Sequence, residues 1–428
     1  MSKVYVKKLI IKDKIYIDKT DVVSPGDLQA AFTYVHGQDI FSDLEETEDQ
    51  YLLPSNSYHK LEWDALVDER KYQKLDYSIS FKGSLRFEQE IAVKKLFKEG
   101  RARSGLLQAK PGWGKTFAAS SLIAQNNSKT LILVHTVLLF EQWLEELSKQ
   151  LGNVVIGKIG DGHFKIEDVT VAIYKSLPSK LDQVRNEFSL IIVDECHKAP
   201  ADMFSGVLNN LNAKVKIGLS ATPSRKDGKH VFLVDFFTPH KVVAEDLRTM
   251  SVPSVQIVPT DFKFTVKDPT RDWVKAINTL CEDEAYIQFV ANKAIEYIAQ
   301  GRCPLIIGDR VLFLKKLQEK IPYSICVIGE TSKEVRETAL KELGTTYKAI
   351  LTTKLFDEGI SCHRLDTLFL TCPSNNPVQW EQRIGRIERL HPDKQFPLIV
   401  DFKLVGVMVS RQQANRRKWY ESKGYYIF

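Results

Sequence analysis

The sequence has few of the features that mark secreted or membrane proteins. Its 428 residues include only six cysteines and no Cys-x-x-Cys pair, so we expect reduced thiols rather than a disulfide framework. No stretch approaches the roughly 18 uncharged apolar residues of a membrane span. The N-terminus alternates lysine with apolar residues and lacks the apolar core of a signal peptide. These absences predict a cytoplasmic protein, in the host cytoplasm if a phage encodes it, with no membrane contact.

The chain also lacks internal repeats, long low-complexity tracts and a large charge excess. A net charge of +6 does not by itself indicate nucleic-acid binding, although basic residues cluster at 3–19 and 411–423. The second cluster includes Trp419 and Tyr420, which either stack on single-stranded nucleic acid or belong to a helix packed on its own domain. The length predicts two or three domains.

The stretch Ala109–Thr116 organises the chain. It follows an apolar run that predicts a strand and precedes a segment, 117–124, that predicts a helix. Glycines in such a turn let backbone N–H groups approach phosphate oxygens, and the helix N-terminus favours negative charge. The Lys115 amine reaches the β/γ-phosphates, and the Thr116 hydroxyl binds Mg²⁺. We therefore predict an ATP site that includes Lys110, Pro111, Gly112, Trp113, Gly114, Lys115 and Thr116.

From residue 106 to about 245, apolar runs alternate with helical periodicity, which predicts βαβ units and a parallel sheet. One run, 190–193, ends in Asp194 and Glu195. Two acids at the end of a buried strand are costly unless they have a function or a partner. Beside a phosphate loop, Asp194 is expected to hold Mg²⁺, and Glu195 to orient and deprotonate the attacking water.

Small polar residues beyond these acids are candidates for coupling the site to another surface. His197 lies two residues after Glu195, and the next predicted strand, 215–219, runs into Ser220 and Thr222. We expect these three residues to link nucleotide chemistry to substrate binding.

The alternation restarts at residue 304 and predicts a second doubly wound sheet without a phosphate loop of its own. Its helix 379–389 carries Gln382, Arg386 and Arg389 at i, i+4 and i+7, which is one helical face. Two arginines on that face fit an arginine-finger role on the γ-phosphate.

Two segments precede the phosphate loop. In residues 1 to 80, apolar alternation at 4–9 and 15–17 predicts a hairpin, and we expect an accessory DNA-binding domain there. Arg86 and Gln89 then lie about twenty residues before the loop. The carboxamide of Gln89 could both donate to and accept from an adenine edge.

Taken in order, these motifs resemble those of superfamily 2 helicases over about residues 82 to 405. Ala-x-x-Gly-x-Gly-Lys-Thr, Asp-Glu-x-His, Ser-Ala-Thr and Gln-x-x-Gly-Arg-x-x-Arg resemble motifs I, II, III and VI, and 85–89 resembles the Q-motif. The stretch 218–228 resembles the XPB, RecG and UvsW group, most like phage UvsW-type branch-migration DNA helicases. The resemblance implies nucleic-acid contacts at His135, Thr136, Gly160, Lys175, Ser176, Thr352 and Thr353, and a nucleotide contact at Gly359.

The resemblance implies an α/β protein with two tandem RecA-like domains, 81–245 and 246–428, after the accessory domain 1–80. It implies an ATP- and Mg²⁺-dependent helicase, a monomer on DNA, that remodels forks, Holliday junctions or duplexes with single-stranded regions. Three alternatives remain open. They are an RNA helicase or translocase with the same motor, the motor of a restriction-type nuclease, and a nucleotide-gated DNA clamp that does not unwind.

Overall fold

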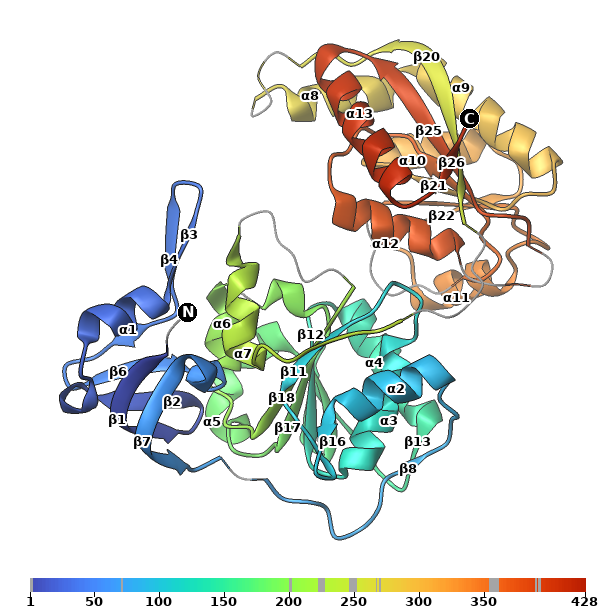
Figure 1. The fold of residues 1–428 in the computed structure, drawn as a ribbon. Coiled ribbons are helices and arrows are strands. Elements are labelled where there is room, and N and C mark those ends of the chain that lie inside the picture. The colour runs from blue at the N-terminus through green and yellow to red at the C-terminus, as the bar shows by residue number, and fades with distance from the viewer. Residues whose placement is uncertain are drawn as a thin grey trace. The chain divides into compact units, whose positions relative to one another are not determined.

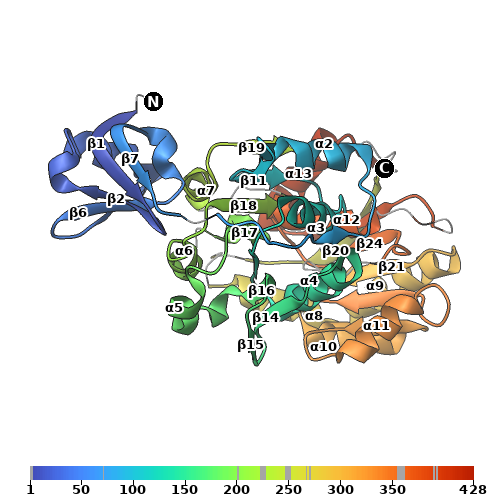
Figure 2. The same cartoon turned by 90° about the horizontal axis from the view of Figure 1, so that it is seen from below.

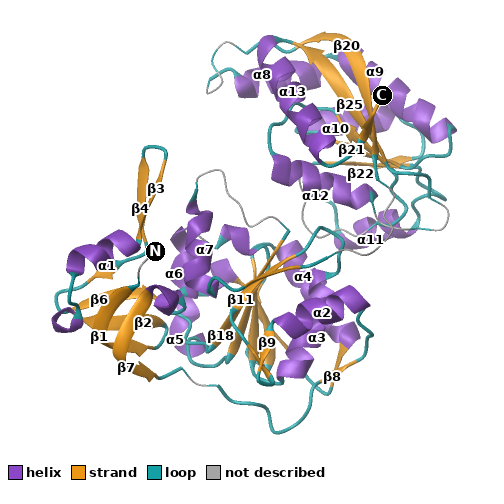
Figure 3. Ribbon diagram, viewed as in Figure 1, coloured by secondary structure: helices purple, strands orange, loops and turns teal. Residues whose placement is uncertain are grey.

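The computed structural model describes residues 3–70, 72–199, 202–221, 228–245, 252–266, 268, 271–353, 362–388, 391 and 394–428. The chain forms two compact units, Met1–Leu247 and Arg248–Phe428. Figure 1 shows the order of their elements and Figure 3 the mixture of helices and strands.

The first unit opens with a five-stranded sheet in the order β5-β6-β2-β1-β7. The predicted hairpin is present, because β1 pairs antiparallel with β2. Its inward residues alternate with exposed ones, as period-2 patterning requires. The edge strand β7 instead pairs parallel to β1. The elements of this region are β1 Val4–Ile11, β2 Lys14–Asp18, α1 Pro25–Ala31, β3 Thr33–His36, β4 Asp39–Ser42, β5 Glu45–Glu46, β6 Gln50–Pro54 and β7 Leu61–Asp68.

An eight-stranded sheet follows, in the order β15-β14-β16-β12-β17-β18-β11-β19. All of its pairings are parallel except that of β14 with β15. Its strands are β11 Gly105–Gln108, β12 Thr130–Val134, β14 Ile156–Gly160, β15 His163–Lys165, β16 Val169–Ile173, β17 Leu190–Val193, β18 Val215–Ser220 and β19 Lys241–Val243. The short strands outside it are β8 Ser80–Phe81, β9 Phe97–Lys98, β10 Arg101–Ala102 and β13 Leu151–Gly152.

Helices cover both faces of this sheet. Helices α2, α3 and α4 pack on one face, and α5, α6 and α7 on the other, between the sheet and the N-terminal strands (Figure 2). Their bounds are α2 Phe87–Lys95, α3 Lys115–Asn126, α4 Val137–Gln150, α5 Leu181–Val184, α6 Asp202–Leu208 and α7 Leu233–Phe237. The segment before residue 81 already contributes Tyr72, Leu75 and Ile79 to the first of these cores. The domain boundary expected near residue 80 stays a prediction.

The second unit contains a seven-stranded parallel sheet in the order β22-β23-β21-β24-β25-β20-β26. The expectation of two tandem RecA-like parallel-sheet domains is therefore confirmed. The elements are β20 Ser254–Lys263, α8 Trp273–Glu282, α9 Glu284–Ala299, β21 Pro304–Ile307, α10 Val311–Lys320, β22 Ser324–Val327, α11 Lys333–Lys341, β23 Ala349–Thr352, β24 Thr367–Leu370, α12 Pro377–Ile387, β25 Leu398–Val405, α13 Val407–Ser422 and β26 Tyr426–Ile427.

The basic C-terminal stretch forms helix α13, which packs on its own domain. Arg416 donates to both Asp401 oxygens, at 2.7 and 2.6 Å. Tyr420 is fully buried, and the Trp419 ring lies 5.7 Å from that of Trp380 on α12. Of the two alternatives for this stretch, single-strand stacking or a packed helix, the structure shows the packed helix, because Arg416, Trp419 and Tyr420 contact residues of their own domain.

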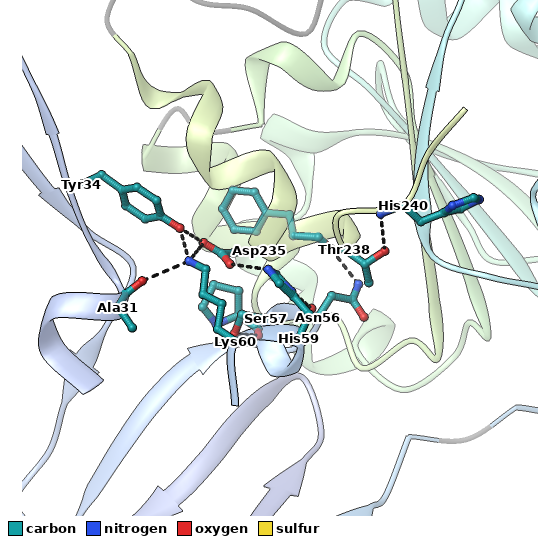
Figure 4. A network of polar contacts seen from close by, with 11 residues as sticks. Ala31, Tyr34, Asn56, Ser57, His59, Lys60, Asp235, Thr238 and His240 are labelled. Atoms are coloured by element: carbon teal, nitrogen blue, oxygen red, sulfur yellow. Dashed lines mark hydrogen bonds and ion pairs between the residues drawn. The ribbon is translucent and has the colours of Figure 1, made fainter. Parts of the chain in front are cut away.

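A buried polar network joins the N-terminal region to α7 (Figure 4). The carboxylate of Asp235, with no exposed surface, accepts a 2.8 Å hydrogen bond from Lys60 and another from the Tyr34 hydroxyl. The His59 ring lies 3.8 Å from the second Asp235 oxygen, and Asn56 donates to the carbonyl of residue 236 at 2.7 Å. The N-terminal region thus contacts the first RecA-like domain through the charged hydrogen bond between Lys60 and Asp235 as well as through apolar packing.

Candidate active site

The phosphate loop connects β11 to the start of α3. Gly112 and Gly114 have φ values of +74° and +93°, which side-chain-bearing residues rarely adopt. A Cβ atom on Gly114 would also lie 2.7 Å from the side-chain nitrogen of Gln89. Helix α3 begins directly after it, at Lys115. The loop therefore has the backbone shape that a phosphate cradle needs.

Arg86 and Gln89, which precede the phosphate loop in the sequence, contact the backbone of this loop. Gln89 Nε2 and the Arg86 guanidinium both donate to the carbonyl of Trp113, at 3.0 and 2.6 Å. Gln89 Oε1 accepts from the backbone N–H of Arg86 at 3.0 Å. The Trp113 ring is itself fully buried and donates its N–H to the carbonyl of Glu245 at 2.8 Å, and its backbone N–H donates to the carbonyl of Lys110 at 3.2 Å. These bonds position the loop, and direct contacts of Arg86, Gln89 and Trp113 with ATP stay predictions.

The acid pair lies at the carboxyl end of β17. Asp194 is buried, and its two oxygens accept from Trp143 Nε1 at 2.8 Å and from the backbone N–H of Glu195 at 2.9 Å. Glu195 has a φ of +47° at the sharp turn into the 3₁₀ turn Cys196–Lys198. Trp143 is not among the residues predicted for the site, because a tryptophan inside an amphipathic helix is typical of an ordinary core position.

The two carboxylates titrate differently. Burial raises the pKa of Asp194, and the adjacent charge of Glu195 adds to this effect. Burial would also raise the pKa of Glu195, but the hydrogen bond from His197 and the positive charge of Lys115 outweigh it and lower the pKa. The lowered pKa keeps the Glu195 carboxylate ionised, and a carboxylate must be ionised before it can accept a proton.

The two described coupling candidates meet at the acids. His197 Nδ1 lies 3.2 Å from Glu195 Oε2 and 3.2 Å from the hydroxyl of Ser220 at the end of β18. Their spacing in the sequence could not show this contact, because the strands β17 and β18 first have to pair. Thr222 lies outside the described residues.

The chemistry of these side chains fits a Mg²⁺-bound triphosphate. Lys115 Nζ donates one hydrogen bond within the described part of the chain, to the carbonyl of Ala109 at 3.3 Å, so an ammonium with spare donors lies at the loop. Its charge acts on both Asp194 and Glu195, which places the cation and the two carboxylates around one site. Thr116 follows on the first turn of α3, as a magnesium-binding hydroxyl requires.

The nucleic-acid candidates of the first unit lie along the same edge of the sheet as the acids. His135 and Thr136 follow β12, Gly160 ends β14, and the 3₁₀ turn Tyr174–Ser176, which contains Lys175, follows β16. Since these strands run parallel to β17, their carboxyl ends share one edge. Thr136 also caps α4, accepting from the backbone N–H of Leu139 at 3.3 Å. The edge thus continues from the acid pair across three neighbouring strands.

The candidates of the second unit are only partly described. Gln382 and Arg386 lie one turn apart on α12, as the spacing predicted. Thr352 is fully buried, donates its hydroxyl to the carbonyl of Val327 at 2.7 Å and accepts from the backbone N–H of Gly308 at 3.0 Å, so its contact with nucleic acid stays a prediction. Thr353 follows β23 and is partly exposed. Gly359 and Arg389 lie outside the described residues.

Comparison with known families defines the class. Residues 82–225 match the type III restriction enzyme res subunit, and residues 290–391 match the helicase conserved C-terminal domain. Together with the relatives below, these matches support a helicase of superfamily 2. Helicases of this superfamily hydrolyse ATP, normally with Mg²⁺, and bind nucleic acid.

Three relatives illustrate the range of proteins that resemble the chain. A probable helicase of Escherichia phage T5 is 28% identical over 75% of this chain and 72% of its own. The DNA 3'-5' translocase XPB2 of Sulfurisphaera tokodaii is 25% identical over 84% of this chain and 90% of its own. An Acanthamoeba polyphaga mimivirus protein named as an RNA helicase is 24% identical over 81% and 69%.

Solved structures agree on the fold. Two structures of Dbp5 from S. cerevisiae, bound to RNA and ADP BeF3, superpose with TM-scores of 0.60 and 0.57 at 13% identity. They cover 79% and 80% of this chain and 88% and 89% of their own. Among the described residues, no helix is long and apolar enough to cross a membrane, and no group of three or more His, Cys, Asp or Glu side chains is placed to hold a metal ion.

Proposed function

We propose that the protein is an ATP-driven DNA helicase or translocase that remodels branched DNA such as forks and Holliday junctions. The observation that carries the proposal is the shared sheet edge. The acid pair, the His197–Ser220 contact and three candidate nucleic-acid segments all lie at the carboxyl ends of neighbouring parallel strands. The relative named as a DNA translocase, aligned over 90% of its length, favours DNA. We also propose residues 1–80 as the module that selects the branched substrate.

Each residue of the first unit has a separate proposed role. The phosphate loop and Lys115 hold the triphosphate, and Thr116 and Asp194 hold Mg²⁺. Mg²⁺ bound there would neutralise charge on the phosphates. Glu195 accepts the proton of the attacking water, and His197 transmits the state of Glu195 to Ser220 at the end of β18.

We further propose that the second unit supplies the groups that stabilise charge on the transferring phosphoryl group. Arg386 and Gln382 share one face of α12, and Arg389 follows after it. An Arg386→Ala or Arg389→Ala variant should still bind ATP, but its turnover should fall by about 10³-fold or more, as for other arginine fingers. Normal turnover in both variants would contradict this role.

The test of the whole proposal is ATPase rate with different nucleic acids. The set comprises no nucleic acid, single-stranded DNA, linear duplex, a synthetic fork, a four-way junction and structured RNA, with Lys115→Ala as the blank. Strongest stimulation by the fork and junction supports branched-DNA remodelling. A rate that no nucleic acid raises above the basal value would overturn it.

An RNA-dependent motor is the second candidate function, because one relative is named as an RNA helicase. Equal or greater stimulation by RNA than by DNA of the same design would support it, and loss of stimulation on removing the 2′-hydroxyls would identify the recognised group. A strand-displacement assay distinguishes both from a nucleotide-gated clamp, which hydrolyses ATP without separating strands.

A further inference from the structure

A cleft of about 470 Å³ lies between the N-terminal sheet and the first RecA-like domain. Three elements line it: the edge strand β7, the β9–β10 hairpin, and the turn that leads into β18. Ser104 and Val215 form part of its wall, directly before β11 and at the start of β18. The cleft is therefore at the amino ends of the strands, opposite the edge that carries the phosphate loop and the acid pair.

The charge of this cleft is positive. Arg101 is exposed and Arg103 partly exposed, and neither has a carboxylate partner among the residues that the structure describes. Lys98 is exposed too, 3.8 Å from the equally exposed Glu99. Both lie on the hairpin that forms one wall. Unpaired arginines beside a concave surface are an electrostatic site for an anion.

The acidic side chain on the opposite wall does not offset this charge. Asp68 accepts from two cations at once, Arg70 at 2.8 Å and Lys214 at 2.5 Å. Burial would raise the pKa of Asp68, but the hydrogen bonds from these cations outweigh it and lower the pKa to about 2. One carboxylate held by two cations leaves a net positive wall, so both sides of the cleft favour an anionic ligand.

An aromatic surface accompanies the cations. Trp63 of β7 and Tyr58 line the cleft and are each partly exposed. The Arg101 guanidinium lies 5.0 Å from the centre of the Tyr72 ring, which holds it at the mouth. Basic side chains bind phosphates and aromatic side chains stack on exposed bases, so this combination fits a nucleic-acid strand better than a compact anion.

We propose that this cleft, the rear cleft, binds the phosphodiester backbone of a second DNA arm. The proposal rests on the proposed function, because only a branched substrate presents an arm beyond the one that the motor holds. It deepens that function by naming how the N-terminal region selects the substrate: β7 and the β9–β10 hairpin together grip phosphates without reading bases.

The test compares two double variants of the full-length protein. R101A/R103A removes both unpaired arginines. K94A/K149A removes the same charge from exposed helix positions, where each lysine pairs with a glutamate one turn earlier, at 2.9 and 2.6 Å. Fluorescence anisotropy measures binding of a labelled fork and of single-stranded DNA between about 50 and 200 mM salt.

For the fork, losing two phosphate contacts should make the negative slope of log K against log salt shallower by about 1.8 in R101A/R103A, and not in the control. Single-strand binding should be the same for both variants. R101K/R103K, which keeps the charge, should recover most of the slope, and this recovery separates charge loss from loosened packing on Tyr72. Thermal unfolding of each variant verifies that it folds.

The outcomes separate the two proposals. If the wild type is stimulated by forks but R101A/R103A and the control have the same slope, the rear cleft is overturned and the motor function stands. If no nucleic acid stimulates the wild type, the proposed function fails, whatever the slopes. A fall of equal size for single-stranded DNA would also overturn the second-arm assignment, because the cleft would then serve the motor's own strand.

Discussion

Replacing Lys216 by methionine should change the pH dependence of stability in a way that the structure specifies. Lys216 lies on β18 with 1% of its surface exposed. Its amine donates to the Ser55 hydroxyl at 2.9 Å and to the Leu208 carbonyl at 3.0 Å, and neither partner is charged. Burial lowers its pKa from 10.5 to about 7, and the positive charge of Arg70 adds to this effect.

The magnitude follows from the difference between these pKa values. At 1.36 kcal/mol per pH unit, lowering the pKa from 10.5 to about 7 costs about 5 kcal/mol of folding free energy. The full cost applies below about pH 7. Between pH 7 and 10.5 the unfolded chain holds a proton that the folded chain lacks, so wild-type stability rises with pH and the cost disappears. Methionine removes this cost at every pH, but it also removes two hydrogen bonds worth roughly 1 kcal/mol or more each.

The Lys216→Met protein should therefore be more stable than the wild type by about 2 kcal/mol at pH 7 and less stable by about 1 kcal/mol near pH 10, with equality near pH 9. Urea unfolding at intervals from pH 6.5 to 10, followed by tryptophan fluorescence, measures the difference. A Lys214→Met variant is the control, because that lysine is paired with Asp68 at 2.5 Å and partly exposed. A difference for Lys216→Met that does not change with pH would refute the reasoning.

Three further changes test the site and the N-terminal contact. Trp143→Phe removes the hydrogen bond to Asp194, so the Mg²⁺ concentration for half-maximal nucleotide binding should rise severalfold, as measured by titrating a fluorescent ATP analogue. Burial and the charge of Asp235 raise the pKa of Asp43 to about 9, so the stability of the wild type should fall as the pH rises from about 4 to 9. Asp43→Asn should abolish this fall, and thermal unfolding at a series of pH values measures it. Gly114→Ala should abolish nucleotide binding, since its φ is +93°.

Features that depend on local pattern could be predicted from the sequence. The strand–loop–helix around the phosphate loop, the acids at the end of β17 and the parallel strands of both units follow from short-range periodicity and turn residues. The chemistry at the ends of parallel strands could also be predicted, because such strands bring their carboxyl ends to one edge whatever their order.

Contacts between distant elements could not be predicted. The hydrogen bond from Trp143 to Asp194 joins residues 51 positions apart, and that from Lys216 to Ser55 joins residues 161 apart. The strand β20 illustrates the same limit. In the sequence, Val252-Pro253 and Val258-Pro259 flank an extended run and predict a linker with edge-strand character. In the structure β26 pairs with Ser254 and Val255, whereas Pro259, which has no N–H to donate, is paired only with β25. The edge character was therefore correct for part of the strand.

The difference between local patterns and long-range contacts also explains why the sequence predicts the ATP site more directly than the substrate. ATP hydrolysis needs a few groups whose spacing is fixed by one loop and one strand end, as at Lys115 and Glu195, so a short motif carries the chemistry. Backbone recognition needs only cations on a suitably shaped surface, as at Arg101 and Arg103, and many sequences satisfy it. The shape of that surface arises only when β7, whose partner β1 lies about sixty residues earlier, packs beside the β9–β10 hairpin. The substrate selection that we propose is therefore a property of the folded arrangement of the N-terminal region, and salt dependence rather than motif comparison is the measurement that tests it.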